Sequence, residues 1–173
     1  MIIDETLGIQ TIKDEYTRKS IRRAVRAVVI QDKKILMVHT NKGDYKFPGG
    51  GVKREESREQ ALMREVTEET GYIIKSIGSC AGKIVQRYVN QFDKEGIFEM
   101  ISYYYFCEVK SNTTSQKLEK YEKEQEFEPK WIELDKVIEY NEGILTKKGS
   151  TINPWVYRET IALKKLKEAG YAK

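Results

Sequence analysis

Residues Gly50 to Tyr72 read GGVKREESREQALMREVTEETGY and are the most informative part of this sequence. Within it, Glu65, Glu68 and Glu69 fall at positions i, i+3 and i+4, which lie on one face of a helix. Three like charges this close repel one another unless a positive charge lies among them. A divalent cation supplies that charge, because Mg²⁺ binds carboxylate oxygens and keeps waters or substrate phosphates as its other ligands. The stretch therefore predicts a metal site suited to phosphate chemistry.

Local signals define the helix that carries these glutamates and the loop before it. Ser57 and Gln60 form a capping box, and Gly71 is the glycine that commonly ends a helix. We therefore expect a helix from about Arg58 to Thr70. The preceding segment, Phe47 to Gly51, predicts a loop where the backbone approaches a ligand closely, since glycine has no Cβ.

This stretch resembles the Nudix box, GX5EX7REUXEEXGU, in which U is an aliphatic residue. The matching residues are Gly50, Glu56, Arg64, Glu65, Val66, Glu68, Glu69 and Gly71. Only the last position departs, because Tyr72 replaces an aliphatic residue, and we expect this to affect packing more than metal binding. The resemblance implies an α+β protein with the Nudix fold. That fold is an α/β/α sandwich in which a mixed β-sheet lies between helices, with a loop-helix-loop catalytic motif and a C-terminal helix.

The resemblance also implies an activity, which is metal-dependent hydrolysis of a pyrophosphate bond in a nucleotide or nucleoside diphosphate derivative. Metal-activated water would attack phosphorus, because metals offset the charge of the phosphate oxygens and lower the pKa of a bound water. Carried over to this chain, Mg²⁺ or Mn²⁺ would be held by Glu65, Glu68 and Glu69, with the backbone carbonyl of Gly50 as a further ligand. We expect a small-molecule nucleotide substrate.

Two charged residues of the box are expected to support the metal ligands. Arg64 lies four residues before Glu68 and can hold that carboxylate by a bidentate pair, which also makes Arg64 a catalytic candidate. Glu56 matches the box glutamate at the helix entrance. It can support the site, or it can act only as a carboxylate that favours the positive end of the helix dipole.

Members of the family often use one more glutamate from a loop before a tryptophan-bearing strand. Here Glu124, Glu126 and Glu128 all precede Trp131. We take Glu126 as the catalytic candidate because Phe127 beside it can anchor the loop. The sequence does not separate the three, and each also fits ordinary surface charge.

Candidate substrate contacts lie on both sides of the box. Arg22 and Arg26 share one face of a strand by its period of two and can meet phosphates, although exposed arginines that aid solubility give the same pattern. Phe47 and Gly49 belong to the glycine-rich loop. Tyr88 lies 16 residues beyond the box, where Nudix enzymes that hydrolyse dinucleoside polyphosphates carry a tyrosine.

The flanking segments predict strands and two further helices. Ala24–Ile30 and Ile35–Val38 indicate a hairpin, and Lys83–Phe92 and Ile97–Val109 indicate a longer one with its turn at Asp93–Gly96. We expect Phe98, Met100, Tyr104 and Phe106 to form one core face of the second long strand. The remaining expectations are an exposed loop or short helix within Ser111–Lys130, a strand at Trp131–Leu134, a helix from Asp135 to Tyr140, and a last helix at 154–169 with Asn153 as its N-cap.

The whole chain favours one domain over residues 1–173, with residues 1–20 as an N-terminal extension. Its 39% apolar and 34% charged residues are ordinary, and no apolar run approaches the roughly 18 residues of a membrane span. The start, MIIDETLG, shows no secretory signal, so we expect a cytoplasmic protein without a membrane partner. Cys80 and Cys107 are expected to be small buried apolar residues.

Charge patterning narrows the function classes. The net charge of +4 comes from intermixed Lys and Glu, and basic residues are dispersed outside residues 18–26, so RNA-end processing or other nucleic-acid binding is not favoured. The alternative to catalysis is a nucleotide-binding regulator on the same fold, but such proteins usually lose box carboxylates that this chain retains. A homodimer is compatible with the sequence.

Overall fold

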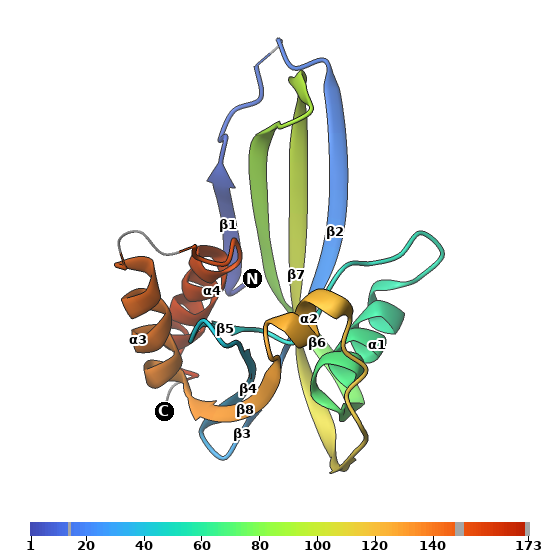
Figure 1. Ribbon diagram of the computed structural model, residues 1–173, viewed down its shortest axis with the longest axis vertical. Coiled ribbons are helices and arrows are strands. Elements are labelled where there is room, and N and C mark those ends of the chain that lie inside the picture. Colours follow the sequence, from blue (N-terminus) through green and yellow to red (C-terminus); the bar gives the residue numbers. More distant parts are fainter. Residues whose placement is uncertain (14, 148–150, 172–173) are drawn as a thin grey trace.

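The computed structural model describes residues 1–13, 15–147 and 151–171. Five strands precede the first helix along the described chain, and Figure 1 shows how the elements are arranged. In chain order they are β1 (Ile3–Gly8), β2 (Arg18–Val28), β3 (Ile30–Gln31), β4 (Lys34–His39), β5 (Tyr45–Lys46), α1 (Arg58–Thr70), β6 (Tyr72–Asn90), β7 (Asp93–Thr113), α2 (Lys120–Glu124), β8 (Glu128–Glu133), α3 (Leu134–Leu145) and α4 (Val156–Glu168).

Two β-sheets form the centre of the molecule. The larger has the strand order β1-β6-β7-β2, in which β6 and β7 are antiparallel while β1 and β2 each run parallel to their neighbour. In the smaller sheet β4 pairs antiparallel with β3, β5 and β8. Both sheets together are mixed, as the sequence predicted.

Helices lie on two sides of these sheets, with α3 and α4 on one side and α1 on the other (Figure 1). One buried apolar cluster joins α3 and α4 to the sheets through residues such as Met37, Ile84 and Leu163. A second joins α1 through residues such as Leu36 and Leu62. The architecture is therefore the predicted α/β/α sandwich. Among the described residues, no helix is long and apolar enough to cross a membrane.

Strand β2 alternates between these two clusters. Val25 and Ala27 face the cluster under α1, whereas Val28 faces the cluster under α3 and α4. Because side chains along a strand alternate with a period of two, Arg26 shares the face of Val28. Its side chain is accordingly buried beside Glu159 of α4, with Arg26 Nε 3.8 Å from Glu159 Oε1.

Helix α1 has the predicted limits, Arg58 to Thr70. The Ser57 hydroxyl accepts from the Gln60 N–H at 3.1 Å, and the Ser57 N–H donates to the Gln60 amide at 2.8 Å, which completes the capping box. Gly71 ends the helix at φ 74°, and its N–H donates to the Thr67 carbonyl. These signals are local, so the sequence alone located both ends.

The predicted hairpin over residues 24–38 is divided between two sheets, which corrects the prediction. The long strand β2 begins at Arg18 and pairs with β7, so only β3 and β4 form the hairpin. Its turn residues, Asp32 and Lys33, both have positive φ, as a tight two-residue hairpin turn requires.

The predicted turn of the long hairpin also shifts. Strand β7 already begins at Asp93, and the chain reverses at Gln91 and Phe92, where the Asn90 side chain accepts from the Phe92 N–H at 3.0 Å. Asp93 instead binds Arg18 Nε at 2.6 Å across the sheet. Asparagine competes as a turn former through this side-chain contact, which explains the earlier turn.

Both ends of the chain differ from expectation. Residues 1–20 are no simple extension, because β1 pairs with β6 and Ile3 is fully buried. Helix α4 begins at Val156 with Trp155 as N-cap, since the Asn153 side chain donates to Asp44 rather than capping the helix.

Of the two cysteines, Cys107 is buried as expected, but Cys80 is exposed.

Candidate functional site

The glycine-rich loop lies along the edge of β2. The Val25 N–H donates to the Gly50 carbonyl at 2.9 Å, and the Ala27 N–H donates to the Pro48 carbonyl at 2.8 Å. Gly49 has φ 139°, and a Cβ at this position would collide with the Val25 carbonyl. At Gly50 a Cβ would meet the end of the Glu65 side chain, which can shift. Glycine at position 49 is therefore what allows the loop to lie against β2.

Glu69 is the most deeply buried carboxylate of the box, at 1% exposed. One oxygen accepts from the Gly49 N–H at 2.9 Å, and the other contacts Lys46 Nζ at 2.5 Å. Burial raises the pKa of Glu69, while Lys46 and the Gly49 N–H act in the opposite direction. The loop and α1 are thus joined by one charged side chain.

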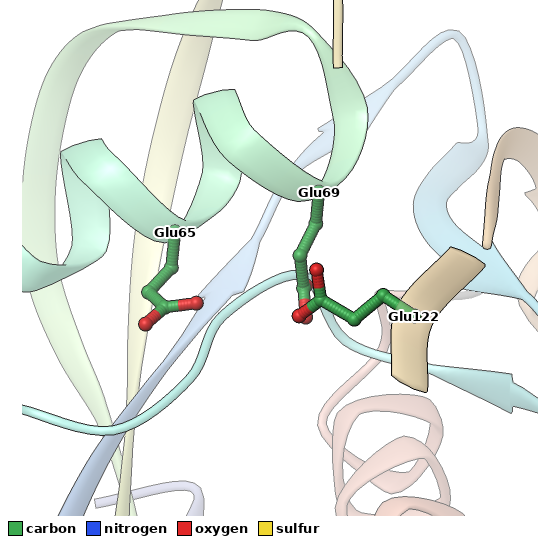
Figure 2. A group of neighbouring side chains, drawn as sticks. All are labelled: Glu65, Glu69 and Glu122. Atoms are coloured by element: carbon green, nitrogen blue, oxygen red, sulfur yellow. The ribbon is translucent and has the colours of Figure 1, made fainter. Parts of the chain in front are cut away.

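Glu122, on the short helix α2, completes a group of three carboxylates with Glu65 and Glu69 (Figure 2). One oxygen of each lies within 4.8 Å of the others. Glu122 is only 3% exposed, and it accepts from the Glu119 N–H at 2.7 Å and from the Tyr121 hydroxyl at 3.0 Å. Two helices far apart in sequence therefore direct carboxylates at one point.

Arg64 contacts three carboxylates of the box, one of which belongs to this group. Its guanidinium forms a bidentate pair with Glu56, at 2.7 and 2.8 Å, and single contacts with Glu65 at 2.7 Å and Glu68 at 3.1 Å. The hydrogen bonds from Arg64 lower the pKa of Glu56 to about 2. The expected bidentate pair with Glu68 is thus corrected, because the fork geometry is used by Glu56.

Glu68 lies outside the group of three. Its side chain is 33% exposed and one of its oxygens contacts Arg64, whereas Glu69 is buried and its carboxylate lies beside that of Glu122 (Figure 2). Residues i and i+3 differ by about 60° around a helix axis, and this rotation separates Glu68 from the buried edge. The helix period places Glu65, Glu68 and Glu69 on one face of α1. In the packed structure, however, only Glu65 and Glu69 join the group with Glu122.

The late glutamates are placed differently from the prediction. Glu124, Glu126 and Glu128 are all exposed, and none belongs to the group with Glu65 and Glu69. Phe127 does anchor this loop, because its side chain is only 3% exposed. However, Glu126 adopts φ 53° and is exposed, whereas Glu122 is the buried glutamate of this segment.

A cavity of about 670 Å³ opens beside the carboxylates. Its walls combine cations, carboxylates and aromatic side chains from the loop, the long strands, α2 and the start of α4. The lining includes Arg22, Arg26, Lys46, Gly49, Gly50, Lys53, Glu65, Gln86, Tyr88, Phe98, Met100, Tyr121, Glu122, Trp155 and Arg158. Its volume falls in the range of small-molecule sites.

Several predicted substrate contacts meet in this cavity. Arg22, Arg26, Gly49 and Tyr88 all line it. Phe47 does not, since its ring is fully buried and meets Tyr104 edge-on at 5.3 Å between centroids. Phe98 and Met100, expected in the core with Tyr104, are partly exposed and line the cavity instead.

A buried network of charges lies at one wall of the cavity. Arg158 donates to Glu159 at 2.9 Å through Nε and to the Gln86 amide oxygen at 3.0 Å through Nη1. Gln86 in turn donates to the Tyr88 hydroxyl at 2.5 Å. Burial and the neighbouring charge of Arg158 lower the pKa of Arg26. The wall therefore holds two guanidiniums against one carboxylate.

Four cavity residues, namely Lys46, Glu122, Trp155 and Arg158, were not predicted as site residues from the sequence. Lys46 and Glu122 lie among many similar charges, in a chain with 31 Lys and Arg and 27 Asp and Glu. Glu119 and Glu122 do show the i, i+3 spacing of a capping box. This spacing marks where a helix begins, but it does not show which way the Glu122 carboxylate faces. Their roles depend on packing.

Comparison with known proteins agrees with this geometry. The family model described as NUDIX domain matches residues 20–155. The chain belongs to the Nudix family. It is 32% identical, over 143 residues, to a Bacillus subtilis (strain 168) protein named "Putative 8-oxo-dGTP diphosphatase YtkD", covering 79% of this chain and 75% of that protein. The resemblance drawn from the box is thereby confirmed, and the chain is a Nudix-type pyrophosphohydrolase that hydrolyses nucleotide pyrophosphate bonds.

Solved structures of this Nudix family share the fold. The MutT NUDIX hydrolase from Burkholderia pseudomallei has a TM-score of 0.58 at 18% identity, covering 85% of this chain and 98% of that one. A NUDIX hydrolase from Nitrosomonas europaea has a TM-score of 0.59 at 22% identity, covering 88% and 91%. The predicted α+β Nudix fold is confirmed.

Proposed function

We propose that this pyrophosphohydrolase works with Mg²⁺ or Mn²⁺ held by Glu65, Glu69 and Glu122. The donor set fits a hard divalent cation, since all three ligands are carboxylates. One oxygen of each carboxylate lies within 4.8 Å of the others, so the three side chains would hold one cation together. The Gly50 carbonyl adds a further ligand, because the Val25 N–H uses only one of its two lone pairs.

Other residues of the chain have distinct roles in this proposal. When bound, the ion offsets the charge of the phosphate oxygens and lowers the pKa of a water. Glu68 accepts the proton of the attacking water, because its side chain is accessible and makes only one contact with Arg64. Arg22 and Arg26 hold phosphate oxygens from the cavity wall.

The observation that carries the proposal is the meeting of Glu65, Glu69 and Glu122 beside the cavity. To test it, nucleotide hydrolysis is measured with Mg²⁺ or Mn²⁺ for the wild type and for Glu68→Gln. We expect Glu68→Gln to lose roughly 100-fold or more in kcat. Glu59→Gln, on the exposed face of the same helix, is the matched control. Activity without added metal after chelation, or equal rates for both variants, would contradict the proposal.

For the substrate, we propose an oxidised purine nucleoside triphosphate such as 8-oxo-dGTP. The support is the name of the Bacillus subtilis relative and a cavity that pairs aromatic side chains with Gln86 and Arg158. We expect kcat/KM for 8-oxo-dGTP to exceed that for dGTP by more than about tenfold. The panel also includes ADP-ribose and diadenosine polyphosphates. A preference for either of those would refute the assignment of the substrate and leave the reaction class intact.

A further inference from the structure

Lys46 is a buried cation inside the proposed metal site. Its side chain is 5% exposed, and Nζ lies 2.5 Å from one oxygen of Glu69 and 3.2 Å from the Gly49 carbonyl. The same ammonium lies 5.1 Å from the centre of the Phe127 ring, so an aromatic face covers it from another side. Strand β5 thus delivers a positive charge directly to the carboxylates.

The charge balance gives this lysine a specific task. Glu65, Glu69 and Glu122 bring three negative charges within 4.8 Å, and two of these side chains are at least nine-tenths buried. Arg64 contacts Glu65, but its bidentate partner is Glu56 outside the group. Lys46 contacts Glu69 directly. Without a cation at this point, the carboxylates would repel one another in a poorly solvated space.

We propose that Lys46 is the internal counter-cation of this carboxylate group and that its charge weakens the binding of a divalent ion. The inference rests on the proposed metal dependence. A divalent ion would compete with the Lys46 ammonium for the Glu69 carboxylate. One Glu69 oxygen already contacts Lys46, and the other accepts from the Gly49 N–H. Two cations that contact the same carboxylate repel each other, so the lysine lowers the affinity for the metal. The same lysine stabilises the metal-free fold.

The test is the affinity of the purified protein for Mn²⁺, measured by titration calorimetry without nucleotide. We expect Lys46→Met to bind Mn²⁺ roughly tenfold or more tightly than the wild type, because the repelling charge is gone. Lys46→Arg retains the charge and is expected to stay close to the wild type. Lys120→Met is the matched control, since it removes the same charge from an exposed position of α2, where Lys120 Nζ lies 3.9 Å from Glu124.

Thermal unfolding gives a second readout that does not depend on activity. Metal-free Lys46→Met is expected to have a lower Tm than the wild type, and Mn²⁺ should raise its Tm more than that of the wild type. If Lys46→Met does not fold, Lys46→Gln carries the same test, because its amide can still donate to Glu69.

The outcomes separate this inference from the proposed function. If the wild type binds Mn²⁺ and the folded neutral variant binds it equally or more weakly, Lys46 does not oppose the metal and the inference is wrong. If the wild type and all variants fail to bind Mn²⁺, the proposed metal dependence fails, and the inference fails with it.

Discussion

At the scale of the residue, the site depends on which glutamates turn inward. Glu69 and Glu122 are almost fully buried, whereas Glu68 is partly accessible and Glu126 is exposed. A buried carboxylate is costly unless it is hydrogen-bonded or paired, and each of these two has such partners. The buried carboxylates are thus suited to holding a cation, and the accessible one to exchanging a proton.

Glu122 offers a direct test of this division. We expect Glu122→Gln to reduce kcat/KM for nucleotide hydrolysis by about 10- to 100-fold, because the metal loses one charged ligand. Glu126→Gln, four residues later on the exposed side, should retain activity within about twofold. The measurement is steady-state hydrolysis at saturating Mg²⁺. A larger loss of activity in Glu126→Gln than in Glu122→Gln would show that Glu126, the candidate from the sequence, is the functional glutamate.

At the scale of the element, Arg64 and Glu56 fasten the segment before α1 to the helix itself. Glu56 accepts from Arg64 through both oxygens and from the Lys53 N–H at 3.1 Å. Arg64 also donates to the Gly51 carbonyl at 3.2 Å. This set of bonds fixes the loop against α1, and so it fixes where the Gly50 carbonyl and the Glu65 carboxylate lie.

The ion pair between Glu56 and Arg64 predicts that stability depends on pH. The pKa of Glu56 is about 2 in the folded protein against an ordinary 4.5, so its contribution is fully present above pH 4.5 and is lost as the pH falls toward 2. We expect Glu56→Gln to lower the free energy of unfolding by about 1 to 2 kcal/mol at pH 7. The difference from the wild type should shrink between pH 4.5 and 2.

Urea unfolding followed by circular dichroism at pH 7, 4.5 and 3 measures this difference. Glu55→Gln is the control, because Glu55 is 92% exposed and pairs only loosely with Arg54 at 3.7 Å. Its stability should match the wild type at each pH. A Glu56→Gln difference that stays constant down to pH 3 would show that charge on Glu56 is not the cause.

At the scale of the whole molecule, Glu159 joins the C-terminal helix to the centre of the fold. It is fully buried, accepts from Arg158 at 2.9 Å and from the Phe47 N–H at 3.0 Å, and lies 3.8 Å from Arg26. The glycine-rich loop, β2 and α4 therefore meet at one carboxylate. The contacts of Glu159 therefore hold the cavity-lining residues Arg26 and Arg158 in place.

Removal of this carboxylate should destabilise the entire fold. We expect Glu159→Ala to lower the free energy of unfolding by about 3 to 5 kcal/mol, because two buried guanidiniums lose their anion. Glu168→Ala, exposed on the last turn of the same helix, should change it by less than about 0.5 kcal/mol. Equal stability of the two variants in chemical denaturation would show that Glu159 is not the link.

Much of the fold was open to prediction because its signals are local. The ends of α1 depend on the capping box and on Gly71, whose partners lie within four residues along the chain. The turn of the long hairpin was misplaced, since two adjacent turn signals compete and cross-strand pairing of Asp93 with Arg18 favours the first. Strand β1 was missed because it pairs with a strand far along the chain, with Ile3 opposite Gly82.

The family, the box helix and the carboxylates on this helix could be predicted from the sequence, because they depend on spacing within a few helical turns. In contrast, the grouping of Glu122 rather than Glu126 with Glu65 and Glu69, and the position of Lys46 among them, depend on the packed fold. Those residues come from β5, α1 and α2, and their meeting is set by how loops close and faces pack. Such long-range contacts leave no periodic pattern in a chain rich in Lys and Glu.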